Sequence, residues 1–326
     1  MVKNSHRAIW YLFTTMMSIF SISCIRIFDG FNWPFYTVTV NALISLCGLV
    51  FHIHRREDDV KTPALAAVKI FLLLNSLCVF VMIGFSLFIV TTQYHNALET
   101  DGEFTSAEAV DEQLEESGKD VLLLETDSLY IFFPKYNDID FVTEKMPSTE
   151  DDSIILSVTA AFQAHHQLSF SHDNIVGMHA SNGELWEGKP ADGVGAFTFV
   201  NGDARIWDID QADEAVKDAA ASGGSGFQQF IILINGNRDY HNEIDEFRCY
   251  RALAIVNGRA CVIDSRTQVH YDEFVEALQD AGIMDALYLD MGSGWNHSWY
   301  RGENNKSVEI IGKPWPFSHS WLEFRR

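Results

Sequence analysis

The 326-residue sequence is poor in cysteine, and what it has forms no Cys/His spacing typical of a zinc site. Three of the five cysteines lie in apolar runs before residue 92, where a small buried hydrophobic side chain is the usual role. Cys249 and Cys261 flank a hairpin expected to turn at Asn257-Gly258, and its register places their side chains on opposite faces. We therefore expect no disulfide between them, no metal and no cofactor.

Basic residues are scarce beyond residue 92. Residues 93–326 hold 16 Lys and Arg against 41 Asp and Glu, a formal charge of −25. Nucleic acid is not an expected partner, because phosphate backbones are bound by basic patches. An anionic ligand must be met by locally placed Arg residues and backbone amides, since the field of the whole acidic part repels it.

Residues 1–92 contain three long apolar runs, Ala8 to Ile25, Phe35 to Ile53 and Ile70 to Val90. Each has close to the ~20 residues needed to cross the hydrocarbon core, so the sequence predicts a membrane anchor of three transmembrane helices with the lipid bilayer as a partner. A cleaved signal is an alternative for the first run, but no small-x-small cleavage site follows it. The basic residues cluster before the first run and between the second and third. This bias predicts a multi-pass plasma (inner) membrane protein with a cytoplasmic N-terminus and an extracytoplasmic C-terminal domain.

The rest of the chain divides by composition. Residues 93–120 are polar and acidic and are typical of a linker, although Ala107 to Glu116 is compatible with a short charged helix as well as with a tether. Residues 121–326 alternate short strand-like runs with two helical segments, Gln211 to Ala221 and Tyr271 to Ala281. Many strands and few helices indicate an α+β fold with a mixed, mainly antiparallel sheet.

The expected strands are nine apolar runs bounded by Gly, Asn and Asp. They are VLLL at 121, LYIFF at 129, IILSVTAAF at 154, GAFTFV at 195, FQQFIILI at 227, YRALAIV at 250, ACVI at 260, ALYLD at 286 and VEII at 308.

The stretch Ala286 to Arg301, ALYLDMGSGWNHSWYR, is the strongest candidate for a site. An apolar strand that ends in Asp290 and breaks on glycines delivers a carboxylate to the edge of a sheet, where clefts form. Asp-x-Gly is also an ordinary tight turn in which Asp bonds its own backbone. Two Trp, an Asn and an Arg in the next eleven residues favour a binding site, because sugars and phosphates need aromatic faces and planar donors.

Taken in order, these segments resemble the phosphodiester glycosidase family. The family's late signature, a strand followed by Leu-Asp-Gly-Gly-x-Ser, is matched by Leu289-Asp290-Met291-Gly292-Ser293-Gly294, with Met291 in place of the first Gly. An Arg that opens a strand is matched by Arg251, and the small-residue-Phe turn of the family by Thr159-Ala-Ala-Phe162. The segment Ile175 to Gly183, with Gly177 and the Asn182-Gly183 turn, continues the match.

The resemblance implies cleavage of a sugar from a phosphodiester, for which one carboxyl group is needed as base or nucleophile while phosphate is already a good leaving group. Asp290 is the expected catalytic carboxylate, and His179 is a second catalytic candidate as acid or phosphate ligand. Arg251 is expected to clamp the phosphate with its fixed fork of donors, unless it only pairs with an acidic neighbour. A hydrogen-bonded structural role is the alternative for His179.

The remaining predicted substrate contacts surround that carboxylate. The backbone amides of the glycine loop are expected to form an anion nest, the indoles to stack on a sugar face, and amide or guanidinium groups to bond hydroxyls and phosphate. These residues are Gly292, Ser293, Gly294, Trp295, Asn296, Trp299, Arg301 and Gln228. Because Gln228 and Gln229 alternate on one strand, only one of the two is expected to face inward.

These observations lead to three hypotheses. The first is a membrane-anchored hydrolase that cleaves a sugar-1-phosphodiester outside the cytoplasm, with a carbohydrate or glycosyl phosphate as substrate. The second is a catalytically inactive module of the cell envelope that binds glycans or sugar phosphates. The third is a purely structural envelope protein, which a large distance between Asp290 and Arg251 would favour. A metal site at His165, His166 and His172 is not expected, because no carboxylate stands at ligand spacing.

Overall fold

The computed structural model describes residues 98–143, 145–164, 171–241, 246–291, 297–311 and 320–326. The three predicted transmembrane runs lie outside these residues, as does the loop 292–296. Within the described ranges, no helix is both long and apolar enough to cross a bilayer.

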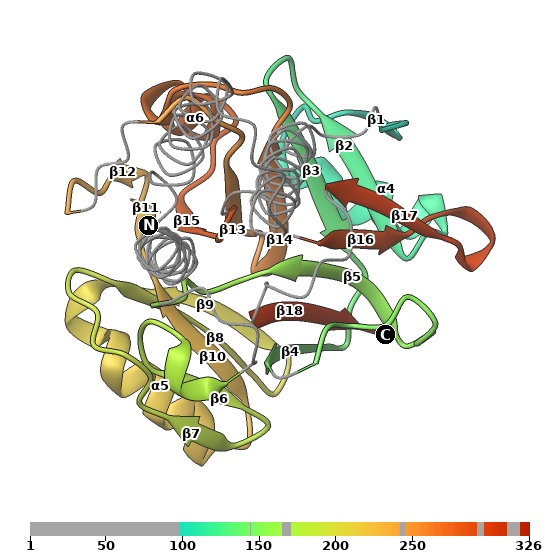
Figure 1. Cartoon of the computed structure of the whole chain (residues 1–326). Coiled ribbons are helices and arrows are strands. Elements are labelled where there is room, and N and C mark those ends of the chain that lie inside the picture. Colours follow the sequence, from blue (N-terminus) through green and yellow to red (C-terminus); the bar gives the residue numbers. More distant parts are fainter. Residues whose placement is uncertain (1–97, 144, 165–170, 242–245, 292–296, 312–319) are drawn as a thin grey trace, which may run out of the picture. The chain divides into compact units, whose positions relative to one another are not determined.

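The described strands form three sheets, which we call sheets I, II and III (Figure 1). Sheet I has eight strands in the order β1 (Gly102–Glu103), β2 (Val121–Glu125), β3 (Leu129–Pro134), β14 (Arg259–Ser265), β13 (Arg251–Val256), β15 (Asp285–Tyr288), β11 (Ile231–Ile234) and β12 (Asn237–Arg238). Sheet II has five in the order β17 (Ser307–Ile311), β16 (Ser298–Arg301), β5 (Ile154–Thr159), β18 (Ser320–Arg325) and β4 (Asp138–Thr143). Sheet III has five in the order β7 (Glu184–Trp186), β6 (His179–Ser181), β10 (Ser225–Gln229), β8 (Gly195–Val200) and β9 (Asp203–Trp207).

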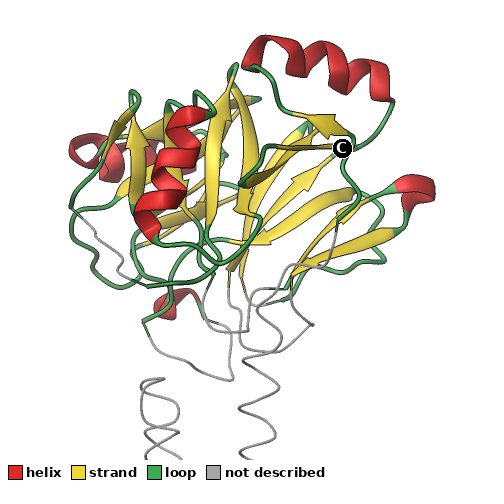
Figure 2. Ribbon diagram, turned by 90° about the horizontal axis from the view of Figure 1, so that it is seen from above, coloured by secondary structure: helices red, strands yellow, loops and turns green. Residues whose placement is uncertain are grey.

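The described residues form three α-helices, which lie at the periphery of the strands (Figure 2). They are α4 (Val110–Ser117), α5 (Ala212–Ala221) and α6 (Tyr271–Asp280), and short 3₁₀ helices occupy Ala107–Ala109, His172–Asn174, Ile209–Gln211 and Glu303–Asn305. Of the two forms left open for residues 107–116, the structure has the helix, and Leu114 of α4 is fully buried. Among the named strands every pairing except β1–β2 is antiparallel, which confirms the predicted mixed and mainly antiparallel α+β fold.

The core lies on both faces of sheet I because its central strands are continuous apolar runs, whose successive side chains face opposite sides of the sheet. On β13, Leu253 faces the space shared with sheets II and III, while Ala252 and Ala254 face the side covered by α4 and α6. The amphipathic face of α6, with Phe274 and Leu278, closes that second layer. Sheet I is therefore sandwiched, and polar side chains on its inner face need partners from the other sheets.

The predicted hairpin between β13 and β14 is confirmed in turn and register. Asn257 and Gly258 both have positive φ, 51° and 74°, which is the backbone of a tight two-residue turn. Ala254 pairs with Cys261, so Cys261 points to the helix-covered face while Cys249 belongs to the other core layer. Both cysteines are free and buried, as expected.

Candidate functional site

Asp290 lies where sheet I meets sheet II. It lies two residues beyond the end of β15 and is half-buried. Its backbone N–H donates to the Ala160 carbonyl at 2.9 Å, and its own carbonyl accepts a hydrogen bond from Thr159 Oγ1 at 2.6 Å. The end of β15 is thus held against the end of β5, and the Asp290 carboxyl group is delivered to the junction of two sheets.

Arg248 is the cation that the structure brings to this junction, and the sequence analysis did not select it. Its Nη2 donates to the Tyr288 hydroxyl at 2.9 Å, and its Nη1 lies 2.9 Å from Glu246 Oε2. Burial opposes its charge, but the charges of Tyr288, Glu246, Tyr250 and Asp290 outweigh this, so the pKa of Arg248 is raised above its ordinary value. The side chain is still 24% exposed, so its guanidinium remains accessible to an anion.

A signal for Arg248 was present in the sequence. In an antiparallel pair, the residue before one strand lies beside the end of its neighbour. β13 pairs with β15 in this way, with Ala252 opposite Tyr288. A basic residue just before β13 therefore reaches the end of β15 more readily than one inside β13.

Arg251 has a different position from the predicted clamp. Its side chain is fully buried, with Nε 2.6 Å from Asp264 Oδ1 and Nη2 2.7 Å from Asp264 Oδ2. Its Nη1 donates to the Ser298 hydroxyl at the start of β16. The guanidinium thus joins sheet I to sheet II through a bidentate ion pair, which was the alternative to phosphate binding.

Trp299 and Arg301, predicted to contact substrate, are buried on the outer face of sheet II, at 1% and 3% exposed. The Arg301 guanidinium lies over the Trp299 ring, 4.9 Å from its centroid, and its nitrogens donate to the carbonyls of Ile154, Asn305 and Asp151. One face of the indole is therefore already covered by a cation. The predicted contacts Gly292, Ser293, Gly294, Trp295 and Asn296 lie outside the described residues.

The glutamine pair divides between two faces of sheet III. Gln228 accepts a hydrogen bond from the Met178 N–H at 2.7 Å and donates to Asp213 of α5, so its amide faces the helix. Gln229 Nε2 instead reaches the Ala160 carbonyl at 3.5 Å, the same carbonyl that binds the Asp290 N–H. The member of the pair that approaches the site is therefore Gln229, whereas the analysis of the sequence selected Gln228.

His179 lies on β6 in a stack of rings. Its Nε2 is 2.9 Å from His172 Nδ1, and its Nδ1 is 3.3 Å from the Gly177 carbonyl. The His172 ring stacks on Trp186 at 3.7 Å. Burial, and to a smaller extent the charge of His172, lowers the pKa of His179 to about 4, although its hydrogen bond to the Gly177 carbonyl acts in the opposite direction. The imidazole is therefore neutral near pH 7. No group of three or more candidate metal ligands occurs among the described residues.

The burial of His179 should be detectable in how the stability of the protein changes at acidic pH. Because the folded-state pKa of His179 is about 4, the unfolded chain takes up a proton as the pH falls from about 6.5 to about 4 while the folded chain does not. We expect this histidine to contribute a loss of stability of about 2–3 kcal/mol across that window. Thermal unfolding of His179→Gln should show a shallower fall in Tm between pH 7 and pH 4.5 than the unmodified protein.

His241→Gln is the matched control, since its imidazole is exposed and bonded to Asp239. The hydrogen bond to Asp239 raises the pKa of His241, so loss of this imidazole should leave the fall in Tm with acid unchanged or make it slightly steeper, never shallower. Equal slopes for the unmodified protein and His179→Gln would contradict a neutral buried imidazole.

These features define an α+β protein in which Asp290 lies at a junction of two sheets, within the electrostatic influence of the Arg248 guanidinium, which is 24% exposed and bonded to the buried Tyr288 hydroxyl. No protein-family model and no curated protein matches the sequence. Among solved structures, the chain is similar to the zebrafish N-acetylglucosamine-1-phosphodiester alpha-N-acetylglucosaminidase catalytic domain, auto-inhibited by its pro-peptide. The identity is 10%, the match covers 63% of this chain and 81% of that chain, and the TM-score is 0.46. A likeness of this size assigns neither family nor activity.

Proposed function

We propose that the protein is a hydrolase that cleaves a sugar-1-phosphodiester, with Asp290 as the catalytic carboxylate and Arg248 as the group that binds the phosphate. The observation that carries the proposal is the place of Asp290, half-buried at the end of β15 and held by hydrogen bonds to Ala160 and Thr159. The three apolar runs and the basic bias around them support a membrane anchor with the domain outside the cytoplasm.

The proposed reaction breaks the bond between the anomeric carbon and the phosphate oxygen. Asp290 accepts a proton from water as the water oxygen bonds to the anomeric carbon, and the phosphate leaves with the electron pair of the broken bond. The products are a free sugar and a phosphomonoester. Arg248 would stabilise the charge that grows on the leaving oxygen, which a strongly acidic surface otherwise disfavours.

The direct test is hydrolysis of a synthetic glycosyl 1-(methyl phosphate) diester by the full chain in ¹⁸O-labelled water. We expect release of sugar and methyl phosphate, with the label in the sugar. Label in methyl phosphate would show attack at phosphorus and overturn this mechanism, and absence of hydrolysis across a panel of sugars would overturn the proposed function.

Substitutions of Arg248 and Glu246 should shift KM in opposite directions. Loss of a charge-assisted bond to phosphate in Arg248→Gln should lower kcat/KM about 10–100-fold, mainly through a higher KM. Glu246→Gln removes the exposed carboxylate that competes for the same guanidinium, so its KM should fall. Steady-state kinetics of both variants on the diester provide the measurement. An unchanged KM in Arg248→Gln would show that another group binds the phosphate.

The second candidate is a glycan-binding module of the cell envelope without turnover. Burial of the predicted clamp favours it, because the Arg251 fork is already occupied by Asp264. The two candidates separate on the unmodified protein, since a binding module retains sugar or sugar phosphate but releases no methyl phosphate from the diester.

A further inference from the structure

A row of four buried polar side chains crosses the outer face of sheet II. Glu323 of β18 pairs directly with Asp140 of β4 on one side and with Ser157 of β5 on the other, and Ser157 pairs with Trp299 of β16. Directly opposed residues share a face of a sheet, so the four side chains stand side by side. With neighbouring strands about 4.8 Å apart, the row extends for about 14 Å.

Three members of the row hold polar atoms without a partner among the described residues. These atoms are Asp140 Oδ1, Ser157 Oγ and Trp299 Nε1. The residues are 9%, 1% and 1% exposed, so water at the surface does not satisfy them. Unpaired buried donors and acceptors are costly and rare in folded proteins, and three in one row indicate a ligand or ordered water between them.

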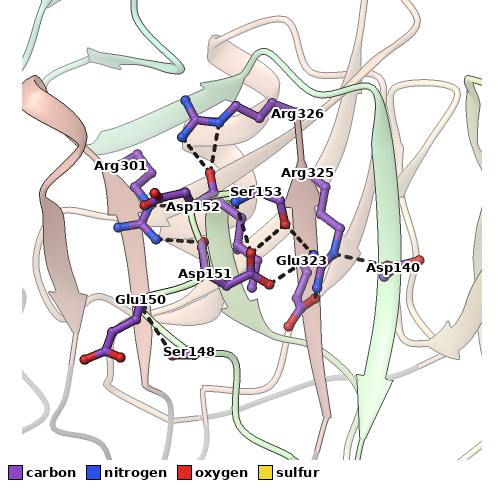
Figure 3. Close-up of polar contacts among 11 residues, drawn as sticks. Asp140, Ser148, Glu150, Asp151, Asp152, Ser153, Arg301, Glu323, Arg325 and Arg326 are labelled. Atoms are coloured by element: carbon purple, nitrogen blue, oxygen red, sulfur yellow. Dashed lines mark hydrogen bonds and ion pairs between the residues drawn. The ribbon is translucent and has the colours of Figure 1, made fainter.

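Ion pairs line one end of the row, and Figure 3 shows the residues there. Arg325 pairs with Glu323, and its Nε lies 3.2 Å from Asp140 Oδ2. Its Nη1 donates to Ser153 Oγ at 2.6 Å and lies 3.3 Å from Asp151 Oδ2. The side chains of Arg325 and Asp151 are 26% and 42% exposed, so the row reaches solvent at this end.

The chemistry of the row selects one class of ligand. Two carboxyl groups disfavour an anion, while the Arg325 guanidinium and the Trp299 indole N–H disfavour a cation. A neutral ligand rich in hydroxyl groups matches the row, because each hydroxyl both donates to a carboxylate or serine oxygen and accepts from an indole N–H. Sugars are such ligands, and indole rings next to hydroxyl-binding groups suit them.

The row also lies near the backbone of Asp290, the candidate catalytic residue. Thr159 follows Ser157 by two residues on β5 and faces the same side of the sheet, which places the two about 7 Å apart along the strand. The Thr159 hydroxyl donates to the Asp290 carbonyl at 2.6 Å. A sugar bound on the row would therefore be adjacent to the end of β15.

We propose that the Asp140–Glu323–Ser157–Trp299 row is a sugar-binding subsite, entered at its Arg325 end. The inference rests on the proposed function, since it names where the glycosyl part of that substrate is held. Ser157 and Trp299 bind hydroxyl groups through the atoms that lack partners, and the carboxyl group of Asp140 accepts from a third.

The test measures sugar binding without turnover. The full chain is titrated with glucose, mannose and N-acetylglucosamine, and binding is followed by tryptophan fluorescence and saturation-transfer NMR. We expect at least one sugar to bind at millimolar concentration. Ser157→Ala and Trp299→Phe should each weaken it about tenfold, because each removes one hydrogen bond; Ser157→Ala nearly preserves side-chain volume, and Trp299→Phe keeps an aromatic ring but loses the indole N–H.

Ser265→Ala is the matched control, because Ser265 is an equally buried serine of sheet I whose hydroxyl accepts from the Tyr250 N–H. It should leave sugar affinity unchanged. Ser157→Ala should fold with an unchanged or higher Tm, since it removes a buried hydroxyl without a partner. If Ser157→Ala does not fold, Trp299→Phe provides the test. Equal affinity in the row variants and the unmodified chain, or no sugar binding at all, would mean that the row holds water only and would overturn the subsite.

Turnover distinguishes failure of this inference from failure of the proposed function. Hydrolysis of the diester that persists with unchanged KM in Ser157→Ala would reject the subsite and retain the hydrolase. Sugar binding that depends on the row in a protein without hydrolysis would retain the subsite and reject the hydrolase.

Discussion

Arg251→Met should lower the free energy of unfolding by about 3–5 kcal/mol, one of the largest effects of any single substitution in the described part of the chain. The substitution leaves the Asp264 carboxylate fully buried without its bidentate partner, and it removes the donor to Ser298. A buried charge that loses its counter-ion has no water to replace it. Thermal unfolding followed by circular dichroism should show a fall in Tm of roughly 10 °C.

Two further variants separate this buried pair from ordinary surface pairs. Arg251→Met combined with Asp264→Leu removes both charges and should recover much of the lost stability, because well-packed apolar residues often replace a buried ion pair without loss. Arg205→Met breaks an exposed pair with Asp203 and should change Tm little. A small effect of Arg251→Met, comparable to that of Arg205→Met, would contradict the burial of the pair.

The position of Arg251 shows that a sequence pattern does not determine what a strand side chain faces. An Arg at the start of a strand has the same appearance in the sequence whether it faces a ligand or another sheet. Its side chain faces inward on β13, and the inward face of sheet I is covered by sheet II. The partner Asp264 lies opposite on β14, and the hairpin register predicted from Asn257-Gly258 already places it there. The ion pair between Arg251 and Asp264 could thus have been predicted from the sequence. The hydrogen bond from Arg251 to Ser298 could not, because it depends on the packing of two sheets.

The strands of sheet I were predictable because apolar runs such as those of β2, β3 and β13 are long and continuous. β4 and β18 were missed because their outer positions carry Asp140, Glu323 and Arg325, which in a short segment are typical of a loop. The positions of these strands that face the core still carry apolar residues at every second place, as Ile139 and Phe141 do on β4. Polar residues at every second position of an apolar strand are a period-two pattern, and here they mark the face that carries the proposed subsite.

The position of Asp290 beyond the end of a strand was predictable from the sequence, because the change from an apolar strand to Asp and glycine is local. Arg248 comes from the segment before β13, and the face that β10 turns toward Ala160 decides that Gln229 rather than Gln228 approaches Asp290. Contacts between segments far apart in the chain follow from pairing and packing, which single-residue patterns do not encode.

Asp290→Asn should reduce kcat for the glycosyl phosphodiester by about 10³-fold while leaving KM nearly unchanged. The amide keeps the shape of the side chain but does not accept a proton from water, and proton transfer in the transition state contributes 10²–10⁴ to such rates. The backbone contacts of Asp290 with Ala160 and Thr159 do not involve the carboxyl group, so the loop should keep its position. Steady-state kinetics and the binding of free sugar, measured on the same preparation, separate loss of chemistry from loss of binding.

Asp285→Asn is the matched control, because Asp285 begins the same strand that Asp290 follows. Its carboxylate accepts a hydrogen bond from the Asn235 N–H at 2.8 Å, so the variant should keep full activity. An equal loss in both variants would indicate damage to β15 rather than to chemistry. Full activity of Asp290→Asn would show that the carboxylate of the reaction lies elsewhere. Asp140 and Glu323 are then the next candidates, because burial raises the pKa of both groups and favours a protonated acid at that position.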